Sequence, residues 1–448
     1  MPRIISKILS RNIYARYLLM AWQKSCKTQT TLPVCKPKPP DLIGKMSPNT
    51  TTNLSLFFII NMLRAIWISK QHWLKPGPMT YMGLLNARAF AENGINTDFF
   101  VRAEQDYNPA NTAEDLLSYY GLPAHPGFTV HCIPETHRLR RDAYQAAVAQ
   151  IKEYHAQGDD IIAATREYGA FAMLLKLKKA CPRLKVVFES HNFFINLKHL
   201  DSRPWSLSRW RTRWVERHQL PVADGLICLT EHQRALYQHW LPQLPTIALP
   251  LGCLDFPPHT DVEQRRLLRR VAYIGHLYDY KGRELFFQLA KHLQAANIQL
   301  HIFGGYPDEV AALQQRALQE QLADTLCFTA FIEPKALHDI LQDQVSIGLV
   351  PLQDTYYNRY LTCPVKVLDF MAHGLPIAAS ELPSVRDLLR ESGVYCRPDD
   401  VEAFAANIQK LLDDPEAYAN CSSATYQRAR ELQWPMRARR IAGFVGDL

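Results

Sequence analysis

From residue 63 onward, short apolar segments alternate with longer amphipathic ones. The short segments have the length and composition of buried strands, and the longer ones repeat apolar residues at the spacing of a helix. Strands that alternate with helices predict parallel sheets with helices on both faces. The expected strands are 64–69, 95–101, 127–132, 160–164, 184–189 and 225–229, then 270–275, 299–303, 326–331, 345–349, 377–379 and 393–396.

A proline-rich segment, 242–258, divides this alternation into two series and is typical of an interdomain linker. Each series has enough strands for a doubly wound domain, so we predict an α/β protein with domains at 62–245 and 246–431. Ligands of such domains lie outside the carboxyl ends of the strands. We therefore expect the active site in the cleft between the domains. Helices are expected at 80–92, 138–157, 171–180 and 283–296.

Residues 1–61 differ in composition from the rest of the chain. They contain nine Lys and Arg residues and one acid, Asp41, whereas the remaining residues contain 42 basic and 42 acidic side chains. Such a basic segment, interrupted by prolines, is not expected to form a packed core. It is either an organellar transit peptide or a poorly ordered leader ahead of a start at Met62. Because the body is formally neutral, we expect no nucleic-acid partner.

Cysteine usage and hydropathy argue against several protein classes. The ten cysteines are scattered without a Cys-x-x-Cys pair, so neither a disulfide framework nor a zinc site is expected. The chain has no Asp-x-Asp pair, and we predict no bound metal. The longest candidate span, Leu54–Ile60, is too short to cross a membrane. We predict a cytoplasmic protein.

The segment that begins at Thr362 has the signals of a short helix with a ligand at its start. Thr362 or Cys363 can cap the helix, Pro364 suits its first turn, and Gly374 suits the left-handed position that ends it. Unpaired amides and the helix dipole favour a phosphate there. Asp369, about two turns into the helix, can accept hydrogen bonds from ribose hydroxyls; an ordinary surface acid is the alternative.

A second segment, Gly275–Gly282, directly follows an expected strand and precedes an expected helix. Gly275 permits close approach of a ligand to the backbone where the strand ends. Lys281 stands at the carboxyl edge of the sheet, where its charge can hold a diphosphate. The alternative for Lys281 is a solvated lysine at a helix start.

Together, the two segments resemble the retaining GT-B glycosyltransferases of the family-four type, the glycosyl transferases group 1. That family has the motif Gly-Arg-Leu-x-x-x-Lys-Gly between a strand and a helix, which Gly275–Gly282 matches. Its later motif, Pro-x-Lys-x-x-Glu-(Tyr/Ala)-Met-Ala-x-Gly-x-Pro-(Val/Ile), matches Pro364–Ile377. The resemblance extends over residues 63–448. Further segments that match in order are Ala223–Glu231, Leu249–Asp255, Phe303–Pro307, Phe328–Ile332 and Leu432–Trp434.

The resemblance implies a GT-B fold, in which two Rossmann-like domains face a common cleft and residues 432–448 form a helix that crosses back to the first domain. Asp369 is one methylene shorter than the family's usual glutamate, and two other donor-site positions also depart from the family pattern. His276 replaces a diphosphate-binding arginine, which makes donor binding sensitive to pH, and Leu361 replaces an acid that contacts the sugar. Backbone amides of 361–365 can take over that contact. The predicted donor-binding residues are Gly77, Gly275, His276, Lys281, Ile332, Thr362, Lys366 and Asp369.

In the first domain, Val186–Asn192 resembles the family's strand end Glu-x-His-(Asp/Asn). The resemblance implies that His191 projects into the cleft and orients the acceptor, while Lys281 stabilises the diphosphate leaving group. These two are the predicted catalytic residues. Glu189 and Arg166 are predicted on the acceptor side, with structural roles as the alternative for both.

The implied activity is that of a hexosyltransferase. A sugar moves from a nucleotide-diphosphate sugar to a glycan or a lipid-linked acceptor, with retention and without metal or other cofactor. The family mechanism is front-face attack assisted by the leaving phosphate. One alternative is a nucleotide-sugar epimerase-like enzyme. The other is a non-catalytic nucleotide-sugar-binding protein of the same fold, which His276 and Leu361 favour.

Tryptophans and arginines gather between Trp205 and Arg217. Basic residues mixed with tryptophan are typical of a helix at a membrane surface. Arginine stems that cover an apolar domain surface are the alternative. Under the first interpretation the protein is peripheral to a membrane and the acceptor is lipid-linked.

Overall fold

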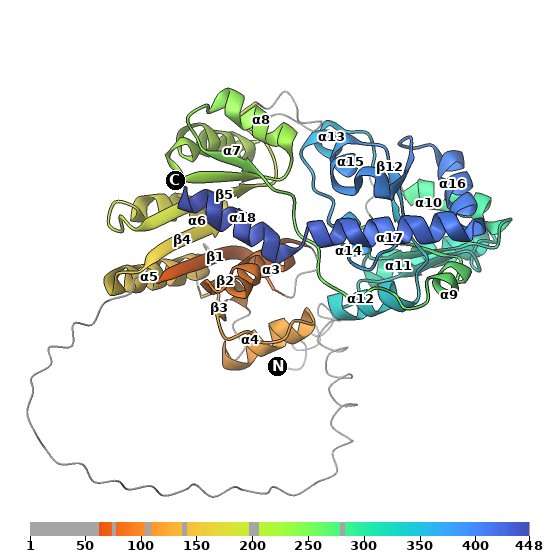
Figure 1. Ribbon diagram of the computed structural model, residues 1–448, viewed down its shortest axis with the longest axis horizontal. Coiled ribbons are helices and arrows are strands. Elements are labelled where there is room, and N and C mark those ends of the chain that lie inside the picture. The colour runs from red at the N-terminus through yellow and green to blue at the C-terminus, as the bar shows by residue number, and fades with distance from the viewer. Residues whose placement is uncertain are drawn as a thin grey trace, which may run out of the picture. The chain divides into compact units, whose positions relative to one another are not determined.

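The computed structural model describes residues 62–73, 78–103, 109–136, 141–196, 206–277 and 283–447, which belong to one compact unit. These residues form two parallel sheets flanked by helices (Figure 1). The predicted α/β class with two Rossmann-like sheets is confirmed, and each sheet with its helices is called a domain below. The predicted leader, 1–61, lies outside the described residues.

The first domain is built on seven parallel strands in the order β3-β2-β1-β4-β5-β6-β7. The chain winds outward from β1 in one direction and then returns to wind outward from β4 in the other. The point between β1 and β4 is where open sheets of this kind leave a crevice for a ligand. The strands are Leu63–His72 (β1), Asn96–Ala103 (β2), Phe128–Pro134 (β3), Asp160–Thr165 (β4), Leu184–Ser190 (β5), Gly225–Cys228 (β6) and Thr246–Ala248 (β7).

Helices cover both faces of the first sheet because successive side chains of a strand point to opposite sides. In β1, Ala65 and Trp67 pack in the core that contains α3, whereas Ile66 and Ile68 pack with residues of α5 and α6. The helices are Pro78–Glu92 (α3), Pro109–Tyr119 (α4), Asp142–Gln157 (α5), Tyr168–Leu177 (α6), Leu207–His218 (α7), Glu231–Trp240 (α8) and the 3-10 turn Leu220–Val222 (η2).

The second domain has six parallel strands in the order β10-β9-β8-β11-β12-β13. They are Arg270–Ile274 (β8), Gln299–Phe303 (β9), Leu326–Thr329 (β10), Ile347–Val350 (β11), Ile377–Ser380 (β12) and Gly393–Cys396 (β13). In β12, Ala378 packs in the core of α10 and α16, which lie side by side in Figure 1, while Ile377 and Ala379 pack in the core of α14. The sequence patterns therefore place the strands of both sheets close to where they lie.

The helices of the second domain are Val262–Leu267 (α9), Arg283–Gln294 (α10), Pro307–Gln319 (α11), Pro334–Asp343 (α12), Tyr356–Tyr360 (α13), Val365–Ala372 (α14), Pro383–Leu389 (α15), the 3-10 turn Arg390–Ser392 (η4), Val401–Asp413 (α16) and Pro415–Glu431 (α17).

Two elements differ from the sequence prediction. β7 lies inside the proline-rich segment 242–258 and pairs with β6, so the first sheet extends past the predicted boundary at residue 245. The sequence patterns indicate no helix in 353–361, but this segment contains α13. A side-chain cap stabilises that short helix, in which Thr355 accepts a hydrogen bond from the Asn358 amide.

After α17 the chain crosses back through α18, Trp434–Gly446, which packs against α3 of the first domain (Figure 1). The crossing packs tightly on the linker that leads out of the first domain. An atom at the Cβ position of Gly252 would lie 2.6 Å from the Trp434 ring. The Cys253 amide donates to the Leu432 carbonyl at 2.8 Å. The two segments that join the domains therefore support each other.

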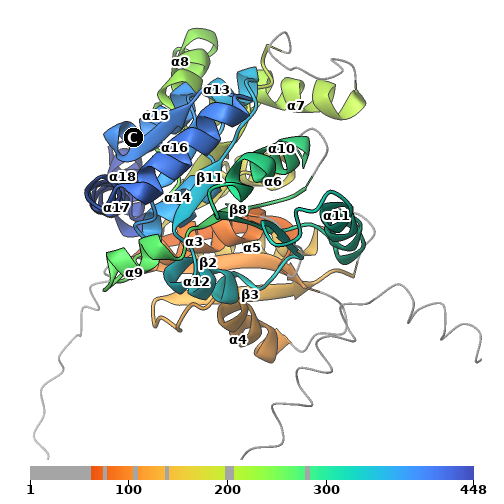
Figure 2. The ribbon, with the colours of Figure 1, turned by 90° about the vertical axis from the view of Figure 1, so that its right-hand side faces the viewer.

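The domains also meet through α3 and α12, which lie close together in Figure 2. The Tyr81 hydroxyl of α3 lies 3.1 Å from His338 Nε2 of α12, and His338 Nδ1 lies 2.9 Å from His373 Nε2. A cavity of about 470 Å³ beside this contact is lined by residues of α3, the linker, α12 and the crossing segment. None of the predicted site residues lines it.

Candidate functional site

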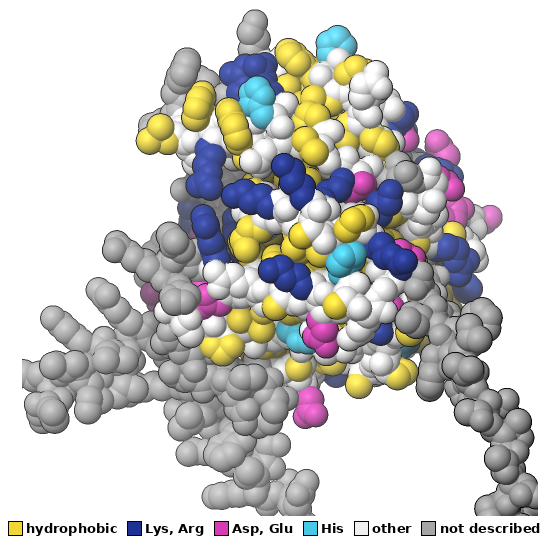
Figure 3. All heavy atoms as spheres, turned by 90° about the vertical axis from the view of Figure 1, so that its left-hand side faces the viewer, with side chains coloured by type: hydrophobic (Ala, Val, Ile, Leu, Met, Phe, Trp, Pro, Cys, Tyr) yellow, Lys and Arg dark blue, Asp and Glu magenta, His cyan; other side chains and the backbone are white. Residues whose placement is uncertain are grey.

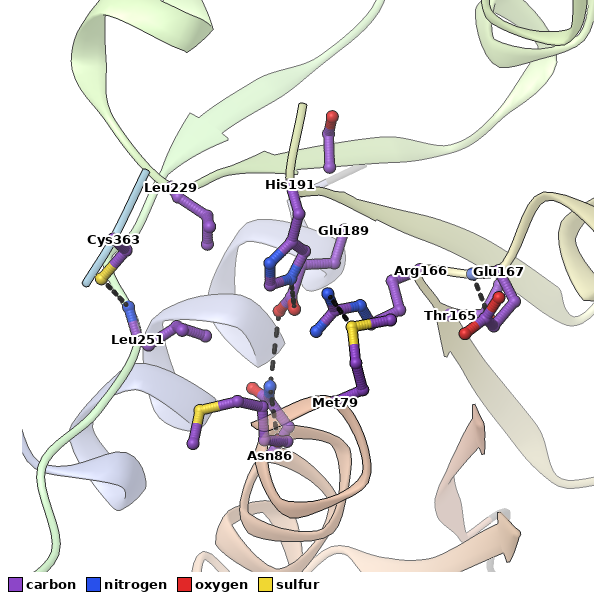
Figure 4. A network of polar contacts seen from close by, with 12 residues as sticks. Met79, Asn86, Thr165, Arg166, Glu167, Glu189, His191, Leu229, Leu251 and Cys363 are labelled. Carbon is purple, nitrogen blue, oxygen red and sulfur yellow. Dashed lines mark hydrogen bonds and ion pairs between the residues drawn. The ribbon is translucent and has the colours of Figure 1, made fainter. Parts of the chain in front are cut away.

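A buried network of charged side chains occupies the carboxyl end of β5 (Figure 4). Glu189, the penultimate residue of that strand, is 1% exposed, and its Oε1 lies 2.6 Å from His191 Nε2. Its Oε2 accepts a hydrogen bond of 2.8 Å from Arg437 Nη2 of α18. Sheet pairing of the apolar part of β5 places the carboxylate at this depth. The crossing helix thus reaches the predicted acceptor side.

The charges of this network determine its protonation. Burial alone would raise the pKa of Glu189, but Arg437, His191 and Arg166 hold the pKa of this carboxyl well below its usual range. Burial and the neighbouring Arg166 lower the pKa of His191, although Glu189 acts in the opposite direction. At neutral pH the pair therefore consists of an ionised Glu189 and a neutral His191.

Arg166 follows β4 and lies beside the same network (Figure 4). Its guanidinium is largely buried, which lowers its pKa, and the nearby groups of Glu189, Glu167 and Tyr357 oppose this effect. Its Nη2 lies 2.7 Å from Met79 Sδ. Because Tyr357 belongs to α13, Arg166 lies where the two domains meet.

In the second domain, β8 ends in a close approach of two glycines. Gly275 has a φ of +136° and Gly304 a φ of +143°, values that side chains rarely tolerate. An atom at the Cβ position of Gly304 would lie 2.0 Å from the Gly275 carbonyl oxygen. The loop that follows β9 can therefore approach the end of β8 this closely only because Gly304 has no Cβ atom.

Lys366, in the first turn of α14, lies against this glycine pair. Its Nζ would lie 3.5 Å from an atom at the Cβ position of Gly275, and it stands 3.8 Å from the centre of the Tyr273 ring. Burial lowers the pKa of Lys366 to about 7. The structure thus brings two predicted donor-site residues together, Gly275 and Lys366.

Asp369 lies one turn further along α14. Burial raises the pKa of Asp369 to about 7. Burial and the charge of Asp369 both raise the pKa values of Tyr81 in α3 and Cys253 in the linker. Asp369 therefore lies on the side of α14 that faces the first domain. A half-buried carboxylate in this place can accept hydrogen bonds from paired hydroxyls.

The start of α14 differs from the prediction. Pro364 takes the N-cap position and no side chain caps the helix, so the predicted capping by Thr362 or Cys363 is wrong. Both residues have other partners. The Thr362 amide donates to the Tyr357 carbonyl at 3.0 Å, and Cys363 Sγ accepts from the Leu251 amide at 3.4 Å. The helix end agrees with the prediction, since Gly374 has a φ of +60°.

Leu361, which replaces an acid of the family pattern, is 1% exposed and packs in a core cluster of the first domain. Its amide donates to the Tyr357 carbonyl at 2.9 Å. The amides of Leu361 and Thr362 are therefore already used, which contradicts the expectation that they take over from the missing acid. Only Cys363 and Val365 of that segment keep amides for such a contact, because Pro364 has none.

The remaining predicted residues are placed as follows. The His276 ring makes an edge contact with Phe331 at 4.8 Å between ring centres. Ile332 follows β10 and packs, partly buried, on the core. Gly77 and Lys281 lie outside the described residues. The structure therefore brings together one group around Glu189 and another around Gly275, and leaves these two residues as predictions.

Sequence reasoning missed Asn86, Tyr357 and Arg437. Asn86 Nδ2 lies 3.4 Å from Glu189 Oε2, and Asn86 Oδ1 accepts from Arg437. An asparagine among the apolar residues of 84–91 is a signal that could have identified Asn86. No local pattern reveals Arg437, because it lies 248 positions from its partner.

The described residues contain neither a group of metal-ligating side chains nor a helix that could span a membrane. In that part of the chain, no three His, Cys, Asp or Glu side chains are grouped so that they could hold a metal ion. Over the same residues, every helix is too short or too polar to cross a bilayer.

The second domain matches a family model, and a part of the chain matches a curated relative. Residues 269–414 match the model described as glycosyl transferases group 1. D-inositol 3-phosphate glycosyltransferase of Thermobispora bispora is 26% identical over 250 residues, which make up 51% of this chain and 56% of that protein. The match thus spans little more than half the length of this relative.

Solved structures share the fold over most of the chain. Sucrose-phosphate synthase of Thermosynechococcus elongatus has a TM-score of 0.62 and 18% identity, with 86% of this chain and 99% of that chain covered. Alr3699/HepE of Anabaena, in complex with UDP and glucose, has a TM-score of 0.58 and 16% identity, with 87% and 100% covered. These likenesses show the GT-B fold. Within that fold, residues 269–414 of the second domain are similar to the glycosyl transferases group 1.

Proposed function

We propose that this chain is a nucleotide-sugar-dependent hexosyltransferase, with the donor on the second domain and the acceptor on the first. The observation that carries the proposal is the position of Lys366 against Gly275 at the end of β8, with Asp369 one turn further along α14. A lysine against a strand end suits a diphosphate, and a carboxylate further along the helix suits a ribose. Alr3699/HepE, which shares the fold, has also been solved with UDP-glucose, and this supports the proposal.

The proposed donor site is completed by residues of both domains. Lys281 adds positive charge at the diphosphate, and His276 adds a charge that depends on pH. Ile332 contacts the base, Thr362 lies near the sugar, and Gly77 lets the first loop approach the phosphate. No metal or other cofactor is part of the proposed site.

The proposed reaction breaks the bond between the anomeric carbon and the diphosphate oxygen. Negative charge then develops on the diphosphate, where Lys366, Lys281 and the helix start stabilise it. The acceptor hydroxyl forms the new bond to the anomeric carbon and passes its proton to the departing phosphate oxygen. Attack from the same face gives retention. His191, Glu189 and Arg166 hold the acceptor side.

A thermal-shift screen against UDP-, GDP-, ADP- and dTDP-sugars tests the donor. A ligand that binds the folded chain stabilises it, by about 2.7 kcal/mol at a hundred times its dissociation constant. Calorimetry with Asp369→Ala and Lys281→Ala should then show weaker binding, whereas Asp339→Ala, on the exposed face of α12, should match the parent. If no nucleotide sugar binds the parent, the proposal fails.

Two assays separate the alternative functions. An epimerase-like enzyme converts the nucleotide sugar without an acceptor, whereas a transferase releases the nucleoside diphosphate in proportion to the glycosylated product. A non-catalytic binding protein shows calorimetric binding but neither conversion nor release. The buried Leu361, which removes an acid from the donor side, is the observation that favours this last function.

We further propose that α7 contacts an anionic membrane and that the acceptor is lipid-linked. Leu207, Trp210 and Trp214 are 89%, 60% and 45% exposed on this helix, and Arg209 and Arg211 lie between them. Figure 3 shows a face on which hydrophobic side chains lie at the surface next to Lys and Arg side chains. Exposed tryptophans among arginines are poorly suited to water and well suited to a bilayer interface.

The other face of α7 is firmly anchored. Glu216 is buried and accepts hydrogen bonds from the Tyr168 hydroxyl at 2.6 Å and the Phe194 amide at 2.7 Å. Flotation with vesicles of phosphatidylcholine and phosphatidylglycerol should recover the parent. Trp210→Ala/Trp214→Ala should reduce this recovery about tenfold. Leu318→Ala, an equally exposed apolar position of the second domain, is the control. Equal recovery of all three proteins would contradict the membrane contact.

A further inference from the structure

Arg437 connects the crossing helix to the predicted acceptor side. The residue is 4% exposed, and its Nη2 donates to Glu189 Oε2 at 2.8 Å. Its other nitrogens are also used, since Nη1 donates to Asn86 Oδ1 and Nε donates to the Pro250 carbonyl at 2.8 Å. One guanidinium therefore binds β5, α3 and the linker between the domains.

These bonds leave Glu189 a single orientation. Its Oε2 lies near both Arg437 and Asn86, whose Nδ2 is 3.4 Å away and also donates to the Met82 carbonyl at 3.1 Å. With Oε2 used in this way, Oε1 points at His191 Nε2, 2.6 Å away. An ionised carboxylate can only accept, so the proton in this hydrogen bond belongs to His191 Nε2.

The tautomer of His191 follows from this bond. In the neutral ring, a proton on Nε2 leaves Nδ1 with a lone pair. Among the residues that the structure describes, Nδ1 has no hydrogen-bond partner. The side chain is 19% exposed, so a hydroxyl of a ligand can approach it.

We propose that Arg437 is a positioning residue of the transferase site. It holds Glu189 in one orientation, and Glu189 in turn keeps the proton of His191 on Nε2. His191 Nδ1 can then accept a hydrogen bond from a hydroxyl of the donor sugar or of the acceptor substrate. This inference rests on the proposed transferase function. It also gives α18 a role beyond packing. The Arg437 guanidinium binds both the Pro250 carbonyl of the linker and Glu189, so a movement of the linker would be transmitted through Arg437 and Glu189 to His191.

The first test reads the tautomer directly and needs no substrate. Long-range ¹H–¹⁵N correlation spectra of the full chain should show His191 of the parent with its proton on Nε2 at neutral pH. Arg437→Met should give a mixture of tautomers and protonated ring, and Arg437→Lys should fall between. Arg440→Met, at an exposed position of the same helix, should match the parent.

The second test is kinetic. Arg437→Met should lower kcat on the order of tenfold to a hundredfold, by analogy with the cost of removing a group that orients a metal-bound histidine. The KM for the donor should change less than kcat, because most of the proposed donor contacts lie on the second domain. Loss of a cation lets the pair of Glu189 and His191 take up a proton more easily, with Arg166 the remaining nearby cation. The acid limb of the kcat profile should therefore move to higher pH.

Glu189→Gln tests the proposal if Arg437→Met does not fold. In Glu189→Gln the amide oxygen should stay with Arg437, and the amide N–H then faces His191, so the ring should carry its proton on Nδ1 instead. A parent-like tautomer and kcat in Arg437→Met, or an unchanged tautomer in Glu189→Gln, would overturn the proposal. If the parent transfers no sugar, the proposed function fails, while the tautomer spectra still test the role of Arg437.

Discussion

The two domains hold their charged site residues in different ways. In the first domain, Glu189 and Arg437 neutralise each other at hydrogen-bond distance, and His191 shares the same carboxylate. In the second domain, Lys366 and Asp369 form no hydrogen bond or ion pair with any residue that the structure describes, and Lys366 only faces the Tyr273 ring. Burial brings the pKa of both to about 7.

The difference indicates that the charged residues of the first domain keep a fixed geometry, whereas those of the second domain are available to bind a ligand. A buried pair that is fully hydrogen-bonded keeps one geometry, and removing one partner leaves the other without compensation. A half-buried charge without a partner costs free energy until a ligand supplies a counter-charge or hydrogen bonds. The first domain is therefore expected to contribute fixed geometry, and the second is expected to gain stability from the donor.

The largest expected effect is a loss of stability when the pair of Glu189 and Arg437 is broken. Glu189→Ala should lower the free energy of unfolding by about 3–5 kcal/mol, because it leaves the Arg437 guanidinium buried without a counter-ion. Urea unfolding measures this loss, and Glu231→Ala, at an exposed carboxylate of the same domain, is the control. The affinity for the donor should stay close to that of the parent. A loss below about 1 kcal/mol would mean that the pair behaves like a surface ion pair.

A smaller effect, on the affinity for the donor, is expected when Lys366 of the second domain is replaced. Lys366→Met should weaken binding of the nucleotide sugar by about 1.5–3 kcal/mol, the usual contribution of a hydrogen bond to a charged group. Its free energy of unfolding should not fall, since a half-buried charge without a partner is replaced by an apolar side chain. Titration calorimetry and urea unfolding give the two numbers. Lys335→Met, at an exposed lysine of α12, should change neither.

A destabilised Lys366→Met variant with unchanged donor affinity would reverse the comparison. It would place the ammonium of Lys366 in the structural network and leave the diphosphate to other groups.

The smallest expected effect is the pH dependence of donor affinity. Asp369, with a pKa of about 7, is mostly protonated at pH 6 and accepts ribose hydroxyls best when ionised, so affinity should rise as pH increases toward 7. Lys366, with a pKa of about 7, loses its charge as pH increases further, so affinity for the diphosphate should then fall. A maximum near neutral pH is expected in calorimetry between pH 6 and 8.

Two variants test whether Asp369 and Lys366 cause the acid and alkaline limbs of this pH profile of donor affinity. Asp369→Asn should flatten the acid limb, and Lys366→Met should flatten the alkaline limb. A profile that keeps both limbs in both variants would assign the pH dependence to other groups, with His276 as the first candidate.

The strands could be predicted because each is a run of apolar residues that must be buried on both faces of a parallel sheet. β8 and β12 lie where the sequence expects them. β7 was missed because three residues among prolines carry too little pattern, and only pairing with β6 defines the strand. The short helix α13 was missed for a similar reason, since its five residues depend on a cap and on packing against the first domain.

The site could be predicted only where its residues are close in sequence. Glu189 and His191 are two positions apart at one strand end, and Lys366 and Asp369 lie on one helix. The capping of α14 was predicted wrongly because Thr362 and Cys363 bind α13 and the linker, which the local sequence cannot show. Arg437 could not be predicted, because its place depends on the complete fold. Gly77 and Lys281 stay predictions.

The crossing helix also has a consequence for the order of events during synthesis. Glu189 enters the first sheet long before its counter-ion exists, because Arg437 follows 248 positions later. A ribosome that has delivered all seven strands of this sheet still holds the chain without α18, so the carboxylate at the end of β5 has Arg166 nearby but lacks its hydrogen-bonded partner Arg437. The proposed acceptor side of the first domain therefore gains its last charged partner only after the second domain has been translated.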